Sequence, residues 1–198
     1  MHYAALPYSR GGGRIRGAFD RFRARGELLR WLREIALLAE APDAATTQEF
    51  LTSLAALHAL TALPASLRRQ AQALTQAVHS GQLVPRHVPM HGDLWHGNVM
   101  RRKDGRLVLI DWGGSAMHGY GLYDLVRCAL AFGLSRRRLA QEVRWHGAAL
   151  GDADQTPMLH LLGALGHYAR NLGEFPLERF VRMSENCVSA LQRALAKP

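Results

Sequence analysis

Cysteine, lysine and long apolar runs are all scarce in this chain of 198 residues. The two cysteines, Cys128 and Cys187, offer no disulfide framework, so a reducing compartment is expected. No run approaches the roughly 18 uncharged apolar residues of a membrane span, and the N-terminus lacks the apolar core of a signal peptide. The sequence therefore predicts a cytoplasmic protein of one domain with no membrane partner.

Acidic residues are also few, with 16 Asp and Glu against 25 Lys and Arg, and the formal net charge is +9. All but two of the basic residues are arginine, and they are spread over several predicted helices. Such a surplus attracts anions, nucleotide phosphates included, and would repel a polycationic aminoglycoside. The chain has no single basic arm and no RNA-binding aromatic motif. We therefore expect a nucleotide and a small-molecule acceptor as partners rather than nucleic acid.

The stretch with the clearest chemistry is residues 91–111, HGDLWHGNVMRRKDGRLVLID. It reads as a polar loop followed by two short apolar runs, with Asp104-Gly105 between them. Asp-Gly in this setting is a hairpin signal. A pairing of Arg102 with Leu107 is the expected register.

That register predicts a cation site at the open end of the hairpin. Asn98 and Asp111 would lie opposite each other just outside the ladder, and opposed side chains leave a sheet on the same face. An amide oxygen and a carboxylate suit Mg²⁺, which takes oxygen ligands and keeps water or phosphate for its other positions. Asp93, in the loop before Asn98, supplies a second carboxylate that could accept a proton from an attacking hydroxyl or orient it.

The order of these motifs resembles a known family. An Asp and an Asn in H-x-D-x-x-x-x-N, then an apolar strand that ends on Asp, are parts of kinase-type phosphoryl transfer. The spelling HGDLWHGN followed by LIDW resembles the aminoglycoside phosphotransferase and choline kinase superfamily of small-molecule kinases. SLAALHAL at 53–60 is similar to the LxxLH helix of that superfamily, and GLYDL at 121–125 to the segment after its metal-binding Asp.

The resemblance implies a role for most polar residues of the stretch. Asp93 would be the catalytic base, while Asn98 and Asp111 would bind the Mg²⁺ that accompanies ATP. Met100 and Ile110 would form the apolar floor of the adenine site.

Two further residues would give structural support. His91 would brace the loop, and the carboxylate of Asp124 would hydrogen-bond the loop backbone. Local interpretations stand beside these roles, because Asp93 is also a common turn former and Asn98 a common cap.

A metal trio of His91, Asp93 and His96 is a further interpretation. No Cys accompanies these residues, and no second His or carboxylate cluster has zinc-like spacing, so zinc is disfavoured. Trp95 and His96 stand where relatives often carry His-Pro. They either line the acceptor pocket or simply pack.

Apolar residues recur at helical spacing along most of the chain, so the predicted fold class is mainly α with a small β-hairpin, an α+β fold. Gly26 is a point where the first helix could break, and Pro42 ends it. Residues 46–49 form a capping-box start, Ser135 caps a later helix, and 112–115 is expected to be a flexible turn. Helices are predicted at about 19–40, 46–63, 66–79, 122–132, 136–150, 158–172 and 177–196.

The resemblance reaches only the C-terminal lobe of the protein-kinase-like fold, with the N-terminal lobe absent or residual. Residues 1–17 are predicted to be a linker or hinge remnant, and residues 18–198 a helical C-lobe with its catalytic loop and hairpin at 91–111. A phosphate-binding strand lysine is missing, because Lys103 lies in the hairpin turn and Lys197 near the C-terminus. The chain would be a shortened form, or work with a lobe from another chain or with Arg in place of Lys, or be retained for binding alone.

The function that these observations predict is transfer of the γ-phosphate of ATP, with Mg²⁺, to a hydroxyl of a sugar-like or amino-alcohol acceptor. One alternative is a catalytically inactive, kinase-like binding protein. The other is a basic helical protein that binds nucleic acid.

Overall fold

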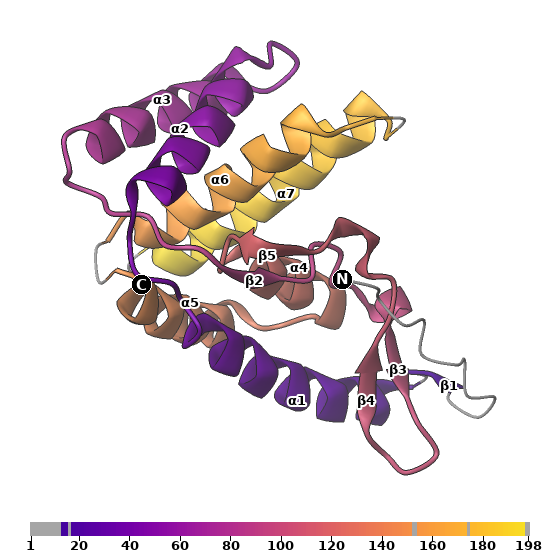
Figure 1. Cartoon of the computed structure of the whole chain (residues 1–198). Helices are drawn as coiled ribbons and strands as arrows, with labels where there is room; N and C mark the ends of the chain where they lie inside the picture. The colour runs from indigo at the N-terminus through magenta and orange to yellow at the C-terminus, as the bar shows by residue number, and fades with distance from the viewer. Residues whose placement is uncertain (1–12, 16, 152–153, 174, 197–198) are drawn as a thin grey trace.

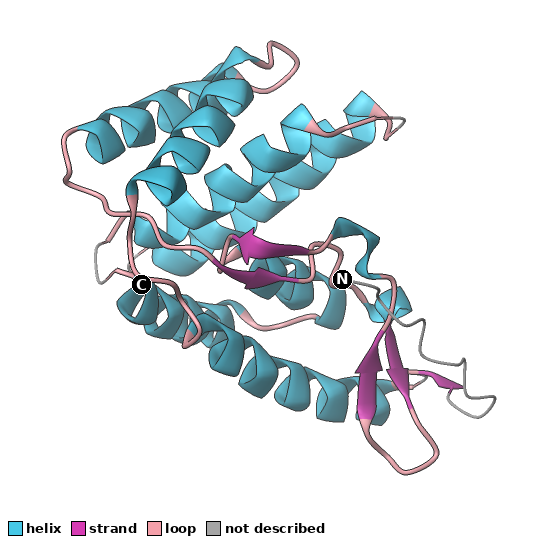
Figure 2. Ribbon diagram, viewed as in Figure 1, coloured by secondary structure: helices cyan, strands magenta, loops and turns pink. Residues whose placement is uncertain are grey.

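Helices make up most of the structure (Figures 1 and 2). The computed structural model describes residues 13–15, 17–151, 154–173 and 175–196. Within these residues the helices are α1 (Ala18–Ala36), α2 (Ala44–Ala59), α3 (Ala65–His79), α4 (Tyr123–Phe132), α5 (Arg136–Leu150), α6 (Thr156–Arg170) and α7 (Leu177–Leu195). The predicted fold class, mainly α with a small β component, is confirmed.

Two small antiparallel sheets complete the described part of the chain, one in the order β1-β3-β4 and one formed by β2 and β5. The strands are β1 (Gly13–Arg14), β2 (Val88–Met90), β3 (Val99–Arg101), β4 (Leu107–Leu109) and β5 (Ala116–Gly119). Two 3₁₀ turns, η1 (His96–Asn98) and η2 (Trp112–Gly114), lie directly before and after the hairpin of β3 and β4.

The first helix, α1, differs from its prediction at Gly26, where a break was possible, and at its C-terminal end, which was predicted at Pro42. It runs unbroken through Gly26, and it ends at Ala36, well before Pro42. Gly26 is exposed, whereas Ala24 and Leu28 on either side of it are buried in the core. Packing of this apolar face therefore outweighs the low helix propensity of one glycine.

The start of α2 corrects the predicted capping box at 46–49. Asp43 is the N-cap, and its Oδ1 accepts the backbone N–H of Thr46 at 2.6 Å. This hydrogen bond lowers the pKa of Asp43. A carboxylate also interacts favourably with the positive end of the helix dipole, which explains why the helix begins earlier than predicted. The predicted cap of α5 is confirmed, because Ser135 accepts the N–H of Arg138 at 3.3 Å.

The hairpin of β3 and β4 forms, but its predicted register is wrong by one residue. Arg101, not Arg102, faces Leu107. The predicted pairing leaves four residues in the turn, whereas the backbone N–H of Arg102 donates to the carbonyl of Arg106 at 2.9 Å and leaves three. As a result Asp111 lies one position beyond the residue that pairs with Asn98.

The hairpin is fastened to the helical body through Arg101. Its Nε lies 2.9 Å from Asp20 Oδ1, and its Nη2 lies 3.2 Å from Glu27 Oε1, both on α1. On its other edge β3 pairs with β1, with Gly13 opposite Arg101. Figure 1 shows the hairpin beside the N-terminal end of α1, where these contacts hold it.

The second sheet was not predicted. β5 pairs antiparallel with β2, with Val88 opposite Gly119, and the expected flexible turn at 112–115 contains the 3₁₀ turn η2 instead. β5 alternates only weakly between buried and exposed positions, so its sequence carries little strand signal. The sheet brings residues 91–98, which follow β2, next to the segment that follows β4.

The core is built by helices packed in pairs, α2 with α6 and α3, α5 with α7, and α1 with α4. The contact of α2 with α6 depends on Gly166, because a Cβ there would overlap the carbonyl oxygen of Ser53. The central helix α4 is buried along most of its length. None of the helices in the described ranges has the combination of length and apolar character that crossing a membrane requires.

Gly26→Ala is expected to raise the free energy of unfolding by about 0.5–1 kcal/mol, because alanine has the higher helix propensity and a Cβ at Gly26 meets no atom within 4 Å. Gly166→Ala is the matched control and should lower it, because of the overlap with Ser53. Urea denaturation followed by circular dichroism measures both changes. An unchanged or smaller free energy for Gly26→Ala would contradict the expectation.

Candidate active site

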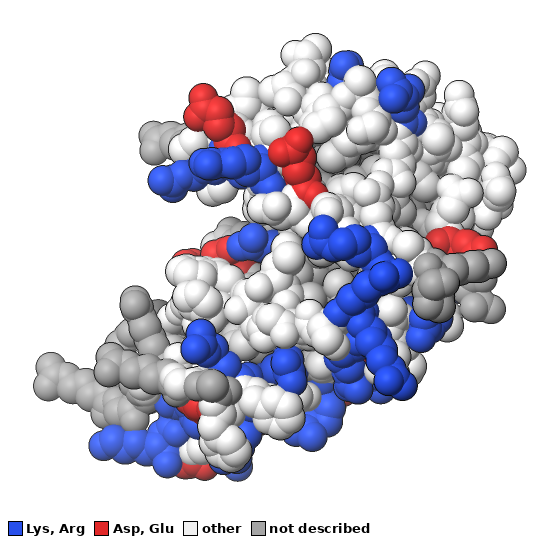
Figure 3. All heavy atoms as spheres, turned by 180° about the vertical axis from the view of Figure 1, so that it is seen from behind, with Lys and Arg blue, Asp and Glu red and all other residues white. Residues whose placement is uncertain are grey.

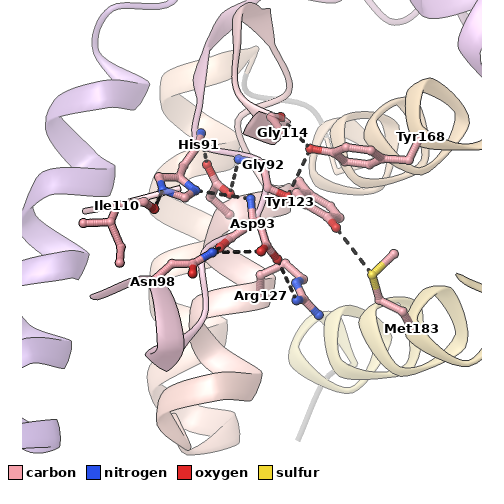
Figure 4. Close-up of polar contacts among 11 residues, drawn as sticks. His91, Gly92, Asp93, Asn98, Ile110, Gly114, Tyr123, Arg127, Tyr168 and Met183 are labelled. Carbon is pink, nitrogen blue, oxygen red and sulfur yellow. Dashed lines mark hydrogen bonds and ion pairs between the residues drawn. The ribbon is translucent and has the colours of Figure 1, made fainter. Parts of the chain in front are cut away.

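The carboxylate of Asp124 fixes the start of the loop between β2 and β3. Asp124 lies in the first turn of α4 and is buried. Its Oδ2 accepts the N–H of His91 at 2.6 Å, and its Oδ1 accepts the N–H of Gly92 at 3.0 Å (Figure 4). Burial raises the pKa of Asp124 to about 6, although the two hydrogen bonds act in the opposite direction. One side chain thus holds two consecutive backbone groups of the loop.

The imidazole of His91 links the loop to the end of β4. His91 Nδ1 accepts the N–H of Asp93 at 3.3 Å, so Nε2 carries the proton and donates it to the carbonyl of Ile110 at 3.0 Å. The ring also packs against Trp112, with 4.5 Å between ring centroids. Both ring nitrogens of this buried histidine are occupied, so His91 has no lone pair to offer a metal ion.

Asp93 lies at the edge of this network with a carboxylate that is only partly engaged. The amide Nδ2 of Asn98 donates to the backbone carbonyl of Asp93 at 2.9 Å and to its Oδ2 at 2.8 Å. Oδ1 faces Arg127 Nη2 at 3.4 Å, and 45% of the side chain is exposed. Figure 4 shows Asp93 between Asn98 and Arg127. A carboxylate that is oriented on one side and open on the other can accept a proton from a bound hydroxyl.

The donor chemistry of Asn98 and Asp111 fits a hard cation. Because the Nδ2 of Asn98 must face Asp93, its Oδ1 is turned away from that carboxylate. Asp111 is exposed, and its carboxylate makes no hydrogen bond to a residue that the structure describes. The N–H of Ile110 donates to the carbonyl of Asn98 at 3.0 Å, so Asp111 directly follows a residue bonded to Asn98. An amide oxygen and a carboxylate at one end of the hairpin are ligands that Mg²⁺ takes in proteins.

Asp111 also has an unusual backbone. Its φ of 60° and ψ of 69° lie in the left-handed region, and among the described residues no other non-glycine residue has a positive φ. Such a conformation costs of order 1–3 kcal/mol and is often found at functional sites. It ends β4 abruptly. The predicted opposition of Asn98 and Asp111 across the ladder is therefore replaced by a sharp turn just after Ile110.

Within the described residues no group of three or more His, Cys, Asp or Glu side chains could hold a metal ion. A cation between Asn98 and Asp111 would therefore need water or phosphate oxygens to complete its coordination, which is the usual situation for Mg²⁺ bound with a nucleotide.

Gly92 and Tyr168 bring the loop against the segment after Asp111. Gly92 has a φ of 84°, and a Cβ on it would overlap the carbonyl oxygen of Gly114. The hydroxyl of Tyr168, on α6, lies 3.1 Å from the carbonyl oxygens of both Gly92 and Gly114 and can donate to either. Burial raises the pKa of Tyr168, so the phenol keeps the proton that it donates.

The outer face of the hairpin is apolar. Val99, Leu107 and Leu109 pack toward the core. Because side chains alternate along strands and β3 pairs with β4 at Met100 and Val108, the residues Met100, Val108 and Ile110 share the opposite face. The two predicted adenine-site residues are thus neighbours of Val108, which sequence reasoning did not single out.

A groove of about 560 Å³ opens beside Asp93, between η1, α4 and α7. Trp95 and His96, for which the sequence left lining and packing open, both line it, and so does Arg127, the partner of Asp93. The complete lining is Trp95, His96, Arg127, Leu130, Ala131, Arg179, Arg182, Met183 and Asn186.

The structure thus gathers His91, Asp93, Asn98 and Asp124 into one network and places Asp111 at its edge. Sequence reasoning missed Arg127 and the arginines of α7. Their positions depend on how α4, α6 and α7 pack, and no local pattern marks them. The one usable signal was the location of Arg127 three residues after Asp124, which puts both on neighbouring positions of one helical face.

The comparisons with known proteins identify the class. The model of the phosphotransferase enzyme family matches residues 3–160, and the chain belongs to this family. This confirms the predicted superfamily of aminoglycoside phosphotransferases and choline kinases. A comparison with curated protein sequences finds no match.

Two solved structures are similar in fold. The choline kinase LicA from Streptococcus pneumoniae has a TM-score of 0.56 at 13% identity. The structure of LicA in complex with AMP has a TM-score of 0.53 at 18% identity. Each match covers 94% of this chain and 68% of the other chain. The likeness confirms a partial kinase-like fold.

Asp124→Asn is expected to loosen the start of the loop. An amide has one acceptor oxygen, so the N–H of either His91 or Gly92 loses its partner, at a cost of about 1–3 kcal/mol. Native-state hydrogen exchange should therefore show at least one of these two amides exchanging about tenfold faster or more. Asp104→Asn, in the exposed hairpin turn, is the control and should leave both rates unchanged. Equal protection in Asp124→Asn and the parent protein would contradict the role of Asp124.

Proposed function

We propose that this protein is a kinase-type phosphotransferase that moves the γ-phosphate of ATP to a hydroxyl of a small molecule. The observation that carries the proposal is the setting of Asp93, whose half-exposed carboxylate is held by Asn98 on one side and faces Arg127, a residue that lines the groove, on the other. Membership of the phosphotransferase enzyme family supports the same reaction class.

In the proposed reaction Asp93 orients the acceptor hydroxyl and receives its proton. The acceptor oxygen forms a bond to the γ-phosphorus, while the bond from that phosphorus to the bridging oxygen of ATP breaks and ADP leaves. Asn98 keeps the Asp93 carboxylate in place through the 2.8 Å hydrogen bond to Oδ2. Most of the rate enhancement in such transfers comes from positioning and charge neutralisation, which is why a fixed carboxylate matters more than a strong base.

Asn98 and Asp111 would hold Mg²⁺. The ion would neutralise charge on the phosphates of ATP. The hydrogen bonds of His91 support this assignment, because they connect Ile110, the residue before Asp111, to the loop that carries Asp93. The apolar face of Met100, Val108 and Ile110 would contact the adenine.

A catalytically inactive binding protein is the second candidate, and one observation favours it. The lysine that holds the α- and β-phosphates in kinases has no counterpart near the site, since Lys103 is exposed in the hairpin turn and Lys197 lies outside the described residues. The two candidates differ in turnover and not in nucleotide binding.

Asp93→Asn is expected to lower kcat by about 10²–10⁴-fold with little change in the dissociation constant of Mg²⁺-ATP, because the amide cannot accept the proton. ADP release is measured with D-glucose, D-gluconate, D-glucose 6-phosphate, D-glucosamine and choline as acceptors, and nucleotide binding by calorimetry. Asp104→Asn is the control for loss of a surface carboxylate. Comparable turnover in Asp93→Asn and the parent would refute the role of Asp93, and nucleotide binding without any turnover of the parent would favour the binding protein.

Asp111→Ala is expected to weaken binding of Mg²⁺-ATP by about tenfold or more, because it removes a ligand of the ion. Calorimetric titrations are run on the variant and the parent, with Mg²⁺ and then with EDTA. The difference between the two proteins should disappear in EDTA. A difference that persists without Mg²⁺ would show that Asp111 acts on the nucleotide or the fold and not through the cation.

A further inference from the structure

The residues that line the groove beside Asp93 include several basic side chains and no acidic ones. Three of its lining residues are arginines, Arg127 on α4 and Arg179 and Arg182 on α7, and none is Asp or Glu. The carboxylate of Asp93 lies 3.4 Å from one of these arginines, Arg127. In Figure 3 Lys and Arg atoms border the hollow at the left edge above and below, and Asp and Glu atoms also lie on both of these sides.

The charges of these arginines are poorly compensated. Arg33, Arg101 and Arg138 each lie within 2.8–2.9 Å of a carboxylate oxygen. By contrast Arg179 and Arg182 make no ion pair with the part of the chain that the structure describes. Such unpaired guanidinium groups around one groove favour binding of an anion.

Arg127 adds a buried donor to the groove. Its side chain is 23% exposed, and its Nη2 lies 3.4 Å from Asp93 Oδ1. Its Nε is enclosed and has no hydrogen-bond partner among the described residues. A buried donor without a partner costs free energy that a ligand oxygen could recover.

The rest of the lining suits a carbon skeleton. Trp95 and Leu130 are 39% and 42% exposed, which is high for large apolar residues, and both line the groove with Met183. The Trp95 ring lies beside His96, with 4.8 Å between ring centroids. A sugar ring or short carbon chain could lie on this surface while its charged end reaches the arginines.

We infer that the acceptor is a hydroxylated compound that carries an oxyanion, either a carboxylate or a phosphate. Arg179 and Arg182 bind the oxyanion, and the hydroxyl to be phosphorylated reaches Asp93 beside Arg127. A guanidinium donates in a planar fork that matches both kinds of oxyanion. This inference rests on the proposed phosphotransfer and adds to it the charge of the substrate. A cationic acceptor would be repelled by the same residues.

A series of sugars that differ in charge tests the inference on the parent protein. Binding of D-gluconate, D-glucose 6-phosphate, D-glucose and D-glucosamine is measured by calorimetry in the presence of Mg²⁺-ADP, and phosphate transfer to each is measured with Mg²⁺-ATP. At least one of the two anionic sugars should bind about tenfold or more tightly than D-glucose, and D-glucosamine most weakly. The comparison of gluconate with the sugar phosphate identifies which oxyanion the groove takes.

The double variant Arg179→Gln/Arg182→Gln locates the effect. It should weaken binding of the preferred anionic sugar by about tenfold or more, and it should remove most of the preference over D-glucose. Arg137→Gln/Arg144→Gln is the matched control, because it removes two exposed arginines of α5 that line no part of the groove. The control should keep both the affinity and the preference.

Several results would overturn the inference. These are tighter binding of D-glucose or D-glucosamine than of both anionic sugars, no measurable binding of either anionic sugar, or equal losses in the double variant and its control. A double variant that loses Mg²⁺-ATP affinity and keeps the anion preference would assign the arginines to the nucleotide instead. Failure of the phosphotransfer proposal looks different, because the anionic sugar would then bind and depend on Arg179 and Arg182 without being phosphorylated.

Discussion

The rest of the site depends on the two hydrogen bonds that the Asp124 carboxylate accepts from backbone N–H groups. Through it, α4 sets where the loop after β2 begins, and from there His91 reaches the end of β4 and Asp93 reaches Asn98. Each link is short and uses a buried or half-buried partner. Because an unmet backbone donor in this interior is expensive, the loop has few alternative conformations. The chemistry of the loop is therefore positioned by a helix that is itself part of the core.

A second set of contacts attaches the hairpin of β3 and β4 to the helices. Its strands are three residues long and could not hold a register on their own. The ion pairs of Arg101 with Asp20 and Glu27 attach it to α1, while Tyr168 of α6 closes the gap between the loop and η2. Contacts from α1 and α6 thus hold the hairpin and the segments on either side of it. The candidate cation ligands, at its open end, are held by residues distant in sequence.

Much of the fold could be predicted from the sequence, because helical periodicity extends over long segments such as α3, α5 and α7. The family could be predicted because its motifs, their order and their spacing are visible in the sequence alone. What failed were features decided by one or two local interactions: Asp43 in place of a capping box, and a hairpin turn one residue shorter than the predicted register implies. What was missed, such as Arg127 and Arg179, depends on how elements far apart in the chain pack together, which no single-sequence pattern records.

The backbone of Asp111 has a meaning beyond ligand geometry. Glycine would adopt its left-handed conformation without the steric penalty that a Cβ introduces, so folding stability alone would favour glycine at this position. An aspartate at this position therefore lowers the stability of the fold relative to glycine. Replacing Asp111 with glycine would therefore increase stability while removing the carboxylate from the proposed cation site.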